Sequence, residues 1–170
     1  YESPMLCTMP MRFVGLSEEP TMKRVQEGQE DLSQRFLKRW RELAARLGME
    51  EAAANAVGDK LLAHYAGSDR HYHNVRHILL MLDGFEALKA KFAQPLAAEV
   101  AIFFHDFVYD PAASDNEVRS AQQMREMLGG LVAGEVLDSA AYSIEATKTH
   151  RATPNADTNL ILDLDMAILG

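Results

Sequence analysis

The sequence has 170 residues and a mass of 18.9 kDa, a length that suits one domain and lets it bury roughly 70% of the surface exposed by its unfolded chain. Apolar residues make up 48% of the chain and charged residues 25%, proportions that are typical of a globular protein and exclude a disordered one. The formal net charge of −8 excludes a broad basic surface for duplex nucleic acid but is compatible with a local basic pocket for a small anion.

Signals for membrane insertion, export and disulfide formation are missing from the sequence. No apolar stretch approaches the roughly 20 residues that cross a bilayer, and no leader-like pattern is present, so we expect a cytoplasmic protein without a membrane partner. Cys7 is the only cysteine, which excludes an internal disulfide framework and a thiolate metal cage. Any bound metal ion must therefore be held by nitrogen and oxygen ligands.

Helical periodicity is weak at the start of the chain and strong after it. Residues 1–30 mix prolines and glycines without a sustained period, which predicts an irregular or weakly helical N-terminal arm. Apolar residues then recur at three- and four-residue steps over about 31–47, and Gly48 follows as a C-terminal cap, which predicts an amphipathic helix. The same spacing predicts further helices over about 50–65, 69–92, 96–108, 133–150 and 157–169.

One more helix is marked by its terminal residues. Ser114 is followed three residues later by Glu117, which predicts a capping box, and Gly129 closes the helix. The helix over 96–108 is apolar on nearly every side, so we expect it at the centre of the fold. No segment shows the alternation of a strand. The predicted fold is an all-α bundle of about six to seven helices, formed by residues 31–170.

Two polar residues stand inside the central predicted helix, in the stretch AIFFHDFVYD over residues 101–110. His105 shares a helix face with Ala101 and Ile102, so it points at the core. Taken alone, His105 is best explained as a core histidine bonded to a backbone carbonyl, and Asp106 as a partly exposed residue or a salt-bridge partner. An unpaired buried carboxylate, however, costs several kcal/mol.

Other ionisable residues gather in two further predicted helices. His73 and His77 lie four apart, a spacing that lets one helix present two nitrogens to a metal ion, although surface coincidence explains it equally well. Asp163 and Asp165 interrupt an apolar run, and each has large apolar residues three or four positions away. A divalent ion held by His77, His105, Asp106 and one of these two late acids would compensate all of these groups together.

The order of these residues resembles the signature of the HD superfamily of metal-dependent phosphohydrolases, which is a histidine, a later His-Asp doublet and a distant aspartate. The chain is most similar to a subgroup of largely uncharacterised, predicted metal-dependent HD phosphohydrolases. The resemblance covers about Trp40 to Gly170. Its blocks are RHYHN over 70–74 leading to His77, FHDFVYD over 104–110, DNE over 115–117 leading to Ser120, Thr147 leading to His150, and DLD over 163–165 followed by Ile168-Leu169-Gly170.

The resemblance implies an HD-domain-like helical bundle for residues 31–170. Members usually continue past the position of Gly170, so a closing C-terminal helix is expected beyond it. The implied activity is hydrolysis of a phosphomonoester or phosphoanhydride of a small molecule by metal-activated water, and a nucleotide is the expected substrate.

The resemblance also implies roles for individual residues. The expected ligands of one divalent ion (Mn, Fe, Co, Ni or Mg) are His77, His105, Asp106 and Asp165, with Asp165 favoured over Asp163. Asp106 is further expected to orient the attacking water, and His73 and His150 are candidates for proton transfer or a second ion. Candidates for binding the substrate are Arg70, Arg76, Lys148 and Asn116.

Two other functions are compatible with the same sequence. One is a nucleotide-binding or regulatory HD module that catalyses no reaction, and the other is a structural helical protein with a fortuitous histidine cluster. Each basic residue near the expected ligands, taken singly, is better explained as an ordinary solvated helix charge. Phosphate release separates the enzyme from the regulatory module, and metal binding separates both from the structural protein.

Overall fold

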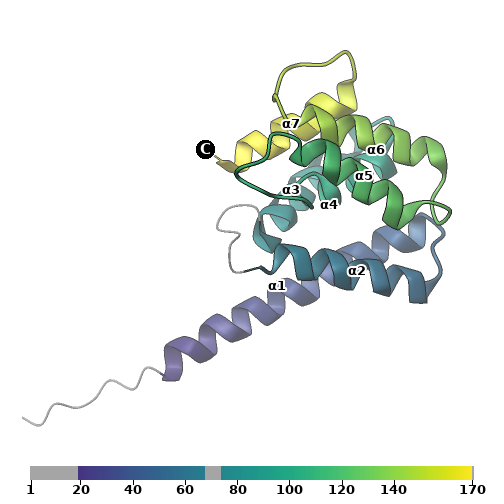
Figure 1. Ribbon diagram of the computed structural model, residues 1–170. Coiled ribbons are helices and arrows are strands. Elements are labelled where there is room, and N and C mark those ends of the chain that lie inside the picture. The colour runs from purple at the N-terminus through teal and green to yellow at the C-terminus, as the bar shows by residue number, and fades with distance from the viewer. Residues whose placement is uncertain (1–18, 68–73, 170) are drawn as a thin grey trace, which may run out of the picture.

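A computed structural model describes residues 19–67 and 74–169, which form seven α-helices, one short 3₁₀-helix and no strand (Figure 1). The prediction of an all-α bundle of six to seven helices is confirmed. None of the helices in these two ranges is both long and apolar enough to cross a membrane. The helices are α1 (Glu19–Arg46), α2 (Glu51–Tyr65), α3 (Val75–Leu88), η1 (Lys89–Lys91), α4 (Pro95–Phe104), α5 (Asn116–Leu128), α6 (Gly134–Ala146) and α7 (Ala156–Leu169).

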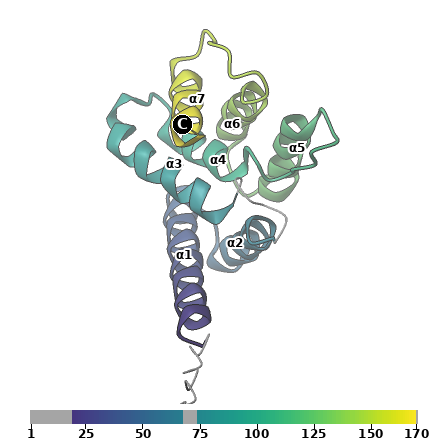
Figure 2. The same cartoon turned by 90° about the vertical axis from the view of Figure 1, so that its left-hand side faces the viewer.

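Helix α4 is the central element, and it packs against α1, α3, α5, α6 and α7. Its sequence is apolar on nearly every side, and every position from 97 to 104 is buried, as the sequence predicted for a central helix. Glu99 is the one charged residue in this stretch, and Arg46 donates to its Oε2 at 2.6 Å. Figures 1 and 2 show α3 and α4 lying between the α1–α2 pair and the α6–α7 pair.

An aromatic cluster joins α1, α2 and α4. Trp40 is fully buried, and its ring lies edge-on to Phe103, with ring centroids 5.3 Å apart, and to Phe104, at 6.2 Å. The indole Nε1 donates to the carbonyl oxygen of Ala54 at 2.7 Å. A Cβ on Gly58 would lie 2.6 Å from Trp40 Cδ1, so α2 approaches α1 this closely only because a glycine stands there. These contacts hold α1, α2 and α4 together.

Two contacts fix α7 against the centre of the bundle. Both carboxylate oxygens of Asp157 accept backbone N–H groups just before α4, from Ala93 at 2.9 Å and Gln94 at 2.7 Å. On the other side, a Cβ on Gly84 of α3 would lie 2.6 Å from Leu164 Cδ2. A side chain at position 84 would therefore force the Leu164 side chain to move. The close approach decides how near side chains on α3 and α7 come to one another.

Of the two alternatives for the arm over residues 1–30, the irregular one is wrong for residues 19–30, because α1 begins at Glu19. Residues 1–18 lie outside the described residues. Pro20 is tolerated because it stands in the first turn, where a backbone N–H has no intrahelical acceptor. The residues after it include Met, Lys, Arg, Gln and Glu, which are good helix formers, and Gly28 costs only about 1 kcal/mol in a helix interior.

Helix α4 is shorter than predicted, because it ends at Phe104 and not near Val108. The N–H of Phe107 donates to Phe104 at 3.0 Å in a tight turn. The N–H of Val108 then donates to Ser120 Oγ on α5 at 2.9 Å and not to a carbonyl one turn back. A tertiary contact with α5 thus follows the end of the helix, and His105 becomes its C-cap residue.

The predicted capping box of α5 is not formed. The helix begins at Asn116 after Asp115, and no side chain caps its first turn. The amide of Asn116 is instead engaged with Asp110, because its Oδ1 accepts the Asp110 N–H at 3.1 Å and its Nδ2 donates to the Asp110 carbonyl at 2.8 Å. This pair closes the loop between α4 and α5, which the sequence pattern did not reveal.

Candidate metal centre

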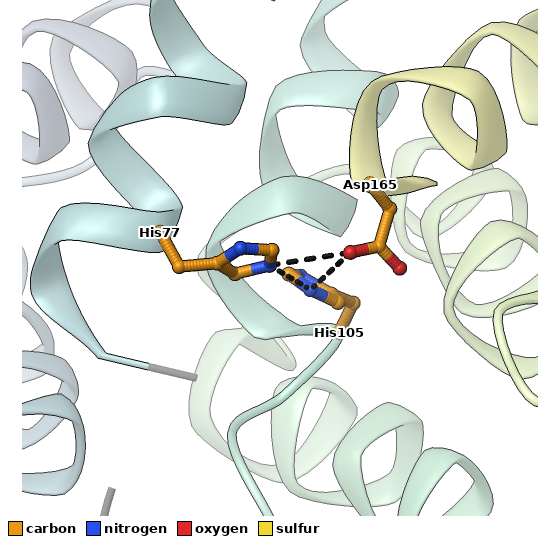
Figure 3. A group of neighbouring side chains, drawn as sticks. All are labelled: His77, His105 and Asp165. Carbon is orange, nitrogen blue, oxygen red and sulfur yellow. Dashed lines mark hydrogen bonds and ion pairs between the residues drawn. The ribbon is translucent and has the colours of Figure 1, made fainter. Parts of the chain in front are cut away.

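Side chains from three helices converge beside the end of α4. His77 comes from α3, His105 is the C-cap of α4 and Asp165 comes from α7, and all three are buried (Figure 3). The two Nε2 atoms lie 3.2 Å apart. Asp165 Oδ1 lies 3.2 Å from Nε2 of His77 and 3.8 Å from Nε2 of His105. These three residues could hold a metal ion.

Asp106 adds a fourth donor to the same cluster. Its Oδ2 lies 3.0 Å from His105 Nε2 and 3.7 Å from His77 Nε2. Metal–ligand bonds to imidazole and carboxylate are about 2.0–2.2 Å long, so neighbouring donors on one ion stand about 3 Å apart. The donor separations of 3.0–3.8 Å fit a single shared ion. The structure therefore groups His77, His105 and Asp165 as possible ligands of one ion and places Asp106 beside the two histidines.

His77 is positioned by the start of its helix. Asn74 is the N-cap of α3, and its Oδ1 accepts the N–H groups of Arg76 at 3.0 Å and His77 at 3.3 Å. This cap places His77 in the first turn of α3, at the side that faces α4 and α7. The role of Asn74 was missed, although an asparagine directly before an apolar periodic segment is a recognised start signal for a helix.

His105 is oriented by the helix that it ends. Its Nδ1 lies 3.0 Å from the carbonyl oxygen of Ile102 and donates to it, since a carbonyl can only accept. The backbone hydrogen bond expected for a core histidine is thus formed by one ring nitrogen, which leaves Nε2 to face the cluster. A backbone acceptor on the outer nitrogen fixes the ring orientation and tautomer of a metal-binding histidine.

The cluster favours positive charge between its carboxylates. Burial opposes a charge on His105, but Asp106, which also accepts its hydrogen bond, and Asp165 outweigh it and raise the pKa of His105 to about 9. Burial likewise opposes a charge on Asp165, but hydrogen bonds from His77 and His150 and the charge of His105 lower the pKa of Asp165 to about 2. Either an imidazolium or a bound cation satisfies this demand for positive charge.

The metal-free protein is expected to lose stability as the pH rises from about 6.5 to 9. A pKa of His105 that is raised to about 9 in the folded state gives a stabilisation that is complete below the unfolded value near 6.5 and is lost through pH 9. Urea unfolding with EDTA at both pH values measures this loss. The His105→Gln variant, which cannot titrate, should lose less stability over the same interval, and equal losses would contradict the shift.

His150 contacts the outer oxygen of Asp165. Its Nε2 lies 2.9 Å from Asp165 Oδ2, while Oδ1 faces the two other histidines. Among the described residues, His150 is the single non-glycine residue with a positive φ, which is 49°. A left-handed conformation costs roughly 1–2 kcal/mol for such a residue, so the surrounding structure holds it against a local preference. His150 therefore contacts Asp165 through the carboxylate oxygen that is not close to His77 and His105.

His150→Ala is expected to weaken metal binding about 10–100-fold, because loss of the hydrogen bond leaves Asp165 free to rotate away. Titration with Co²⁺ followed by calorimetry measures the affinity. His150→Gln, whose amide can still donate to the carboxylate, should recover part of it. His64→Ala is the control, since His64 lies outside the cluster. Equal affinity of the wild-type and alanine variants would show that His150 does not position Asp165.

The open choice between Asp163 and Asp165 is decided by burial. Asp165 is 4% exposed and faces α3 and α4, whereas Asp163 is exposed. Two residues along a helix correspond to about 200°, so the two acids point in nearly opposite directions. Only Asp165 joins the group of donors.

Three other predicted site residues that the structure describes are not gathered in the cluster. Arg76 is exposed one position before His77. Lys148 donates through Nζ to the Ser114 carbonyl, which ties the end of α6 to the loop before α5. Asn116 is engaged with the backbone of Asp110. Arg70 and His73 lie outside the described residues.

Comparisons of the chain with models of protein families, with curated proteins and with solved structures give no match. The function proposed below is therefore inferred from the sequence and from the geometry of the described side chains.

Proposed function

We propose that this protein is a metal-dependent phosphohydrolase of the HD superfamily. The observation that carries the proposal is the convergence of two imidazole nitrogens, 3.2 Å apart, with two carboxylates in a largely buried cluster. The order of the donors along the chain, His77, then His105-Asp106, then Asp165, supports the family assignment. A structural protein gains nothing from this arrangement, because buried charges that are packed together cost more than apolar residues of similar volume.

The donor set fits a divalent transition metal ion. His77, His105, Asp106 and Asp165 would hold it through two nitrogens and two oxygens, which suits Mn, Fe, Co and Ni. Mg is less well suited, since it prefers an all-oxygen shell that retains several waters. When bound, such an ion supplies Lewis-acid chemistry, which polarises a phosphoryl oxygen and acidifies water.

Asp106 and His150 are proposed to have different roles at the cluster. Asp106 is the most accessible of the four, with its side chain 19% exposed against 1–6% for the others. Substrate and water would therefore approach from the side of Asp106, whose carboxylate can accept a hydrogen bond from the attacking water and orient it. His150, through Asp165, would hold the opposite side of the cluster in place.

A phosphomonoester or phosphoanhydride of a small molecule is the proposed substrate, and a nucleotide is the preferred case. The protein has a net charge of −8, so a diffusing anion is not attracted by the molecule as a whole. Local positive charge at the cluster would have to supply the attraction, which explains why activity should depend on bound metal.

The test is phosphate release from a panel of nucleotides and sugar phosphates by EDTA-treated protein, with and without added Mn²⁺, Co²⁺, Ni²⁺ or Mg²⁺. We expect release only with metal, and none from a His105→Ala variant. Metal binding without release from any substrate would instead support the nucleotide-binding regulatory module. Absence of metal binding would support the structural protein.

A further inference from the structure

A pocket of about 400 Å³ is lined in part by the residues that directly follow Asp106 in the chain. It lies between the end of α2, the segment that follows Asp106, and α5, and the lining residues used below are His64, Phe107, Tyr109, Arg119, Gln122 and Gln123. Consecutive Cα atoms are 3.8 Å apart, so residues 107 to 109 lie within about 11 Å of Asp106. One ligand the size of a nucleotide can therefore contact both the pocket and the cluster.

One wall of the pocket offers an aromatic surface. The rings of His64 and Phe107 pack against each other, with centroids 4.0 Å apart and an interplanar angle of 34°. Tyr109, which is 41% exposed, adds a third ring to the lining. Phe107 itself is 3% exposed, so His64 and Tyr109 are the exposed rings, and exposed rings are used in proteins as surfaces on which flat heteroaromatic ligands stack.

The part of the lining that lies on α5 offers hydrogen-bonding groups. Gln122 and Gln123 donate their amide N–H groups to the two oxygens of Glu126, at 2.9 Å and 2.7 Å. With the amide nitrogens engaged in this way, the amide oxygens are the groups that can accept hydrogen bonds from a ligand. One N–H of each amide also stays available to donate, so the wall can bind a ligand edge that carries both N–H groups and acceptors.

Arg119 adds a strong donor to the same wall. Its closest charged partner is Asp115 at 3.9 Å, beyond hydrogen-bond distance, and its side chain is 48% exposed. The guanidinium fork binds a pair of acceptors on a planar edge, such as a ring carbonyl and an adjacent ring nitrogen. Arg119 and the glutamine oxygens together complement an edge with both carbonyl acceptors and N–H donors.

We propose that this pocket binds the base of the nucleotide substrate, and that it selects a base with a ring carbonyl beside N–H donors, as in guanine, over adenine. The inference rests on the proposed function, because it takes the phosphate of the same nucleotide to lie at the cluster. Guanine offers acceptors to Arg119 and N–H groups to the glutamine oxygens, whereas adenine carries an amino group where guanine carries its carbonyl.

Calorimetric titration of the full chain with GMP and with AMP, in EDTA, tests the inference without metal chemistry. Both nucleotides carry the same phosphate, so a difference in affinity reports on the base. We expect GMP to bind about tenfold more tightly than AMP, and Arg119→Ala to remove most of that preference. Arg125→Ala is the matched control on the same helix, since Arg125 pairs with Asp138 at 2.7 Å and does not line the pocket.

The two proposals fail in different ways. Equal affinity for GMP and AMP, absence of binding, or an unchanged preference in Arg119→Ala would overturn the base pocket, even if metal-dependent phosphate release were observed. A preference for GMP that persists in His105→Ala would support the pocket in a protein without a functional cluster. If the wild-type protein released no phosphate with any added metal but still preferred GMP to AMP, the proposed hydrolase alone would be overturned.

Discussion

If the proposed metal centre binds a divalent ion, the ion should stabilise the wild-type protein, and replacement of His105 by alanine is expected to abolish that stabilisation. A metal present at about 100 times its dissociation constant stabilises a folded protein by about 2.7 kcal/mol. For a chain of this size, that corresponds to a rise in Tm of roughly 5–10 °C. His105→Ala removes the Nε2 that lies 3.2 Å from His77 and 3.0 Å from Asp106, so no rise should remain.

The fold should survive this substitution, because His105 is the C-cap residue that follows α4 and does not lie inside the helix. Far-UV circular dichroism and thermal unfolding with and without Mn²⁺ measure both properties. Asp165→Ala should also lose the metal-dependent shift, while Asp163→Ala, on the exposed side of the same helix, should retain it. Loss of the shift in Asp163→Ala, or its retention in His105→Ala, would show that the ion binds elsewhere.

The largest loss of stability is expected from Trp40→Ala. The side chain is fully buried between α1, α2 and α4, and truncating a buried tryptophan costs about 3–5 kcal/mol. The substitution also removes the donor that bonds the Ala54 carbonyl at 2.7 Å. A loss of about 4 kcal/mol corresponds to a fall in Tm of roughly 8–16 °C for a chain of this length.

Urea unfolding of the metal-free protein measures the change in the free energy of unfolding. Trp40→Phe, which keeps an aromatic ring but loses the hydrogen bond, should be affected less than Trp40→Ala. Leu80→Ala is the exposed control, because Leu80 is 44% exposed and should lose less than about 1 kcal/mol. A loss in Trp40→Ala no greater than that of Leu80→Ala would contradict the central role of this cluster.

The sequence predicted the helical architecture because its signal is local. Apolar residues at three- and four-residue steps mark one face of a helix whatever the rest of the chain does, and the wholly apolar segment before His105 predicted the central position of α4. The candidate ligands were also found locally, as polar residues in segments otherwise suited to burial. Burial of His77, His105 and Asp165 bears out that reasoning.

The ends of the helices were predicted less well, because partners distant in sequence decide them. The predicted extension of α4 to residue 108 overlooked Ser120 Oγ, which takes the Val108 N–H from twelve residues away. The capping box before α5 was wrong because Asn116 bonds Asp110 in the loop. In both cases a side chain offered the backbone an alternative partner that helical periodicity does not reveal.

The amino-acid sequence by itself determined that this chain forms helices and that a few of its polar side chains lie in apolar surroundings. Only the tertiary structure decided that Asp165 and not Asp163 joins the two histidines, that His150 contacts it, and that the residues directly following Asp106 line a pocket. The reason is physical. Periodicity fixes the face of a helix on which a residue lies, whereas the distance between faces depends on close packing such as that at Gly84 and on ties such as that of Asp157.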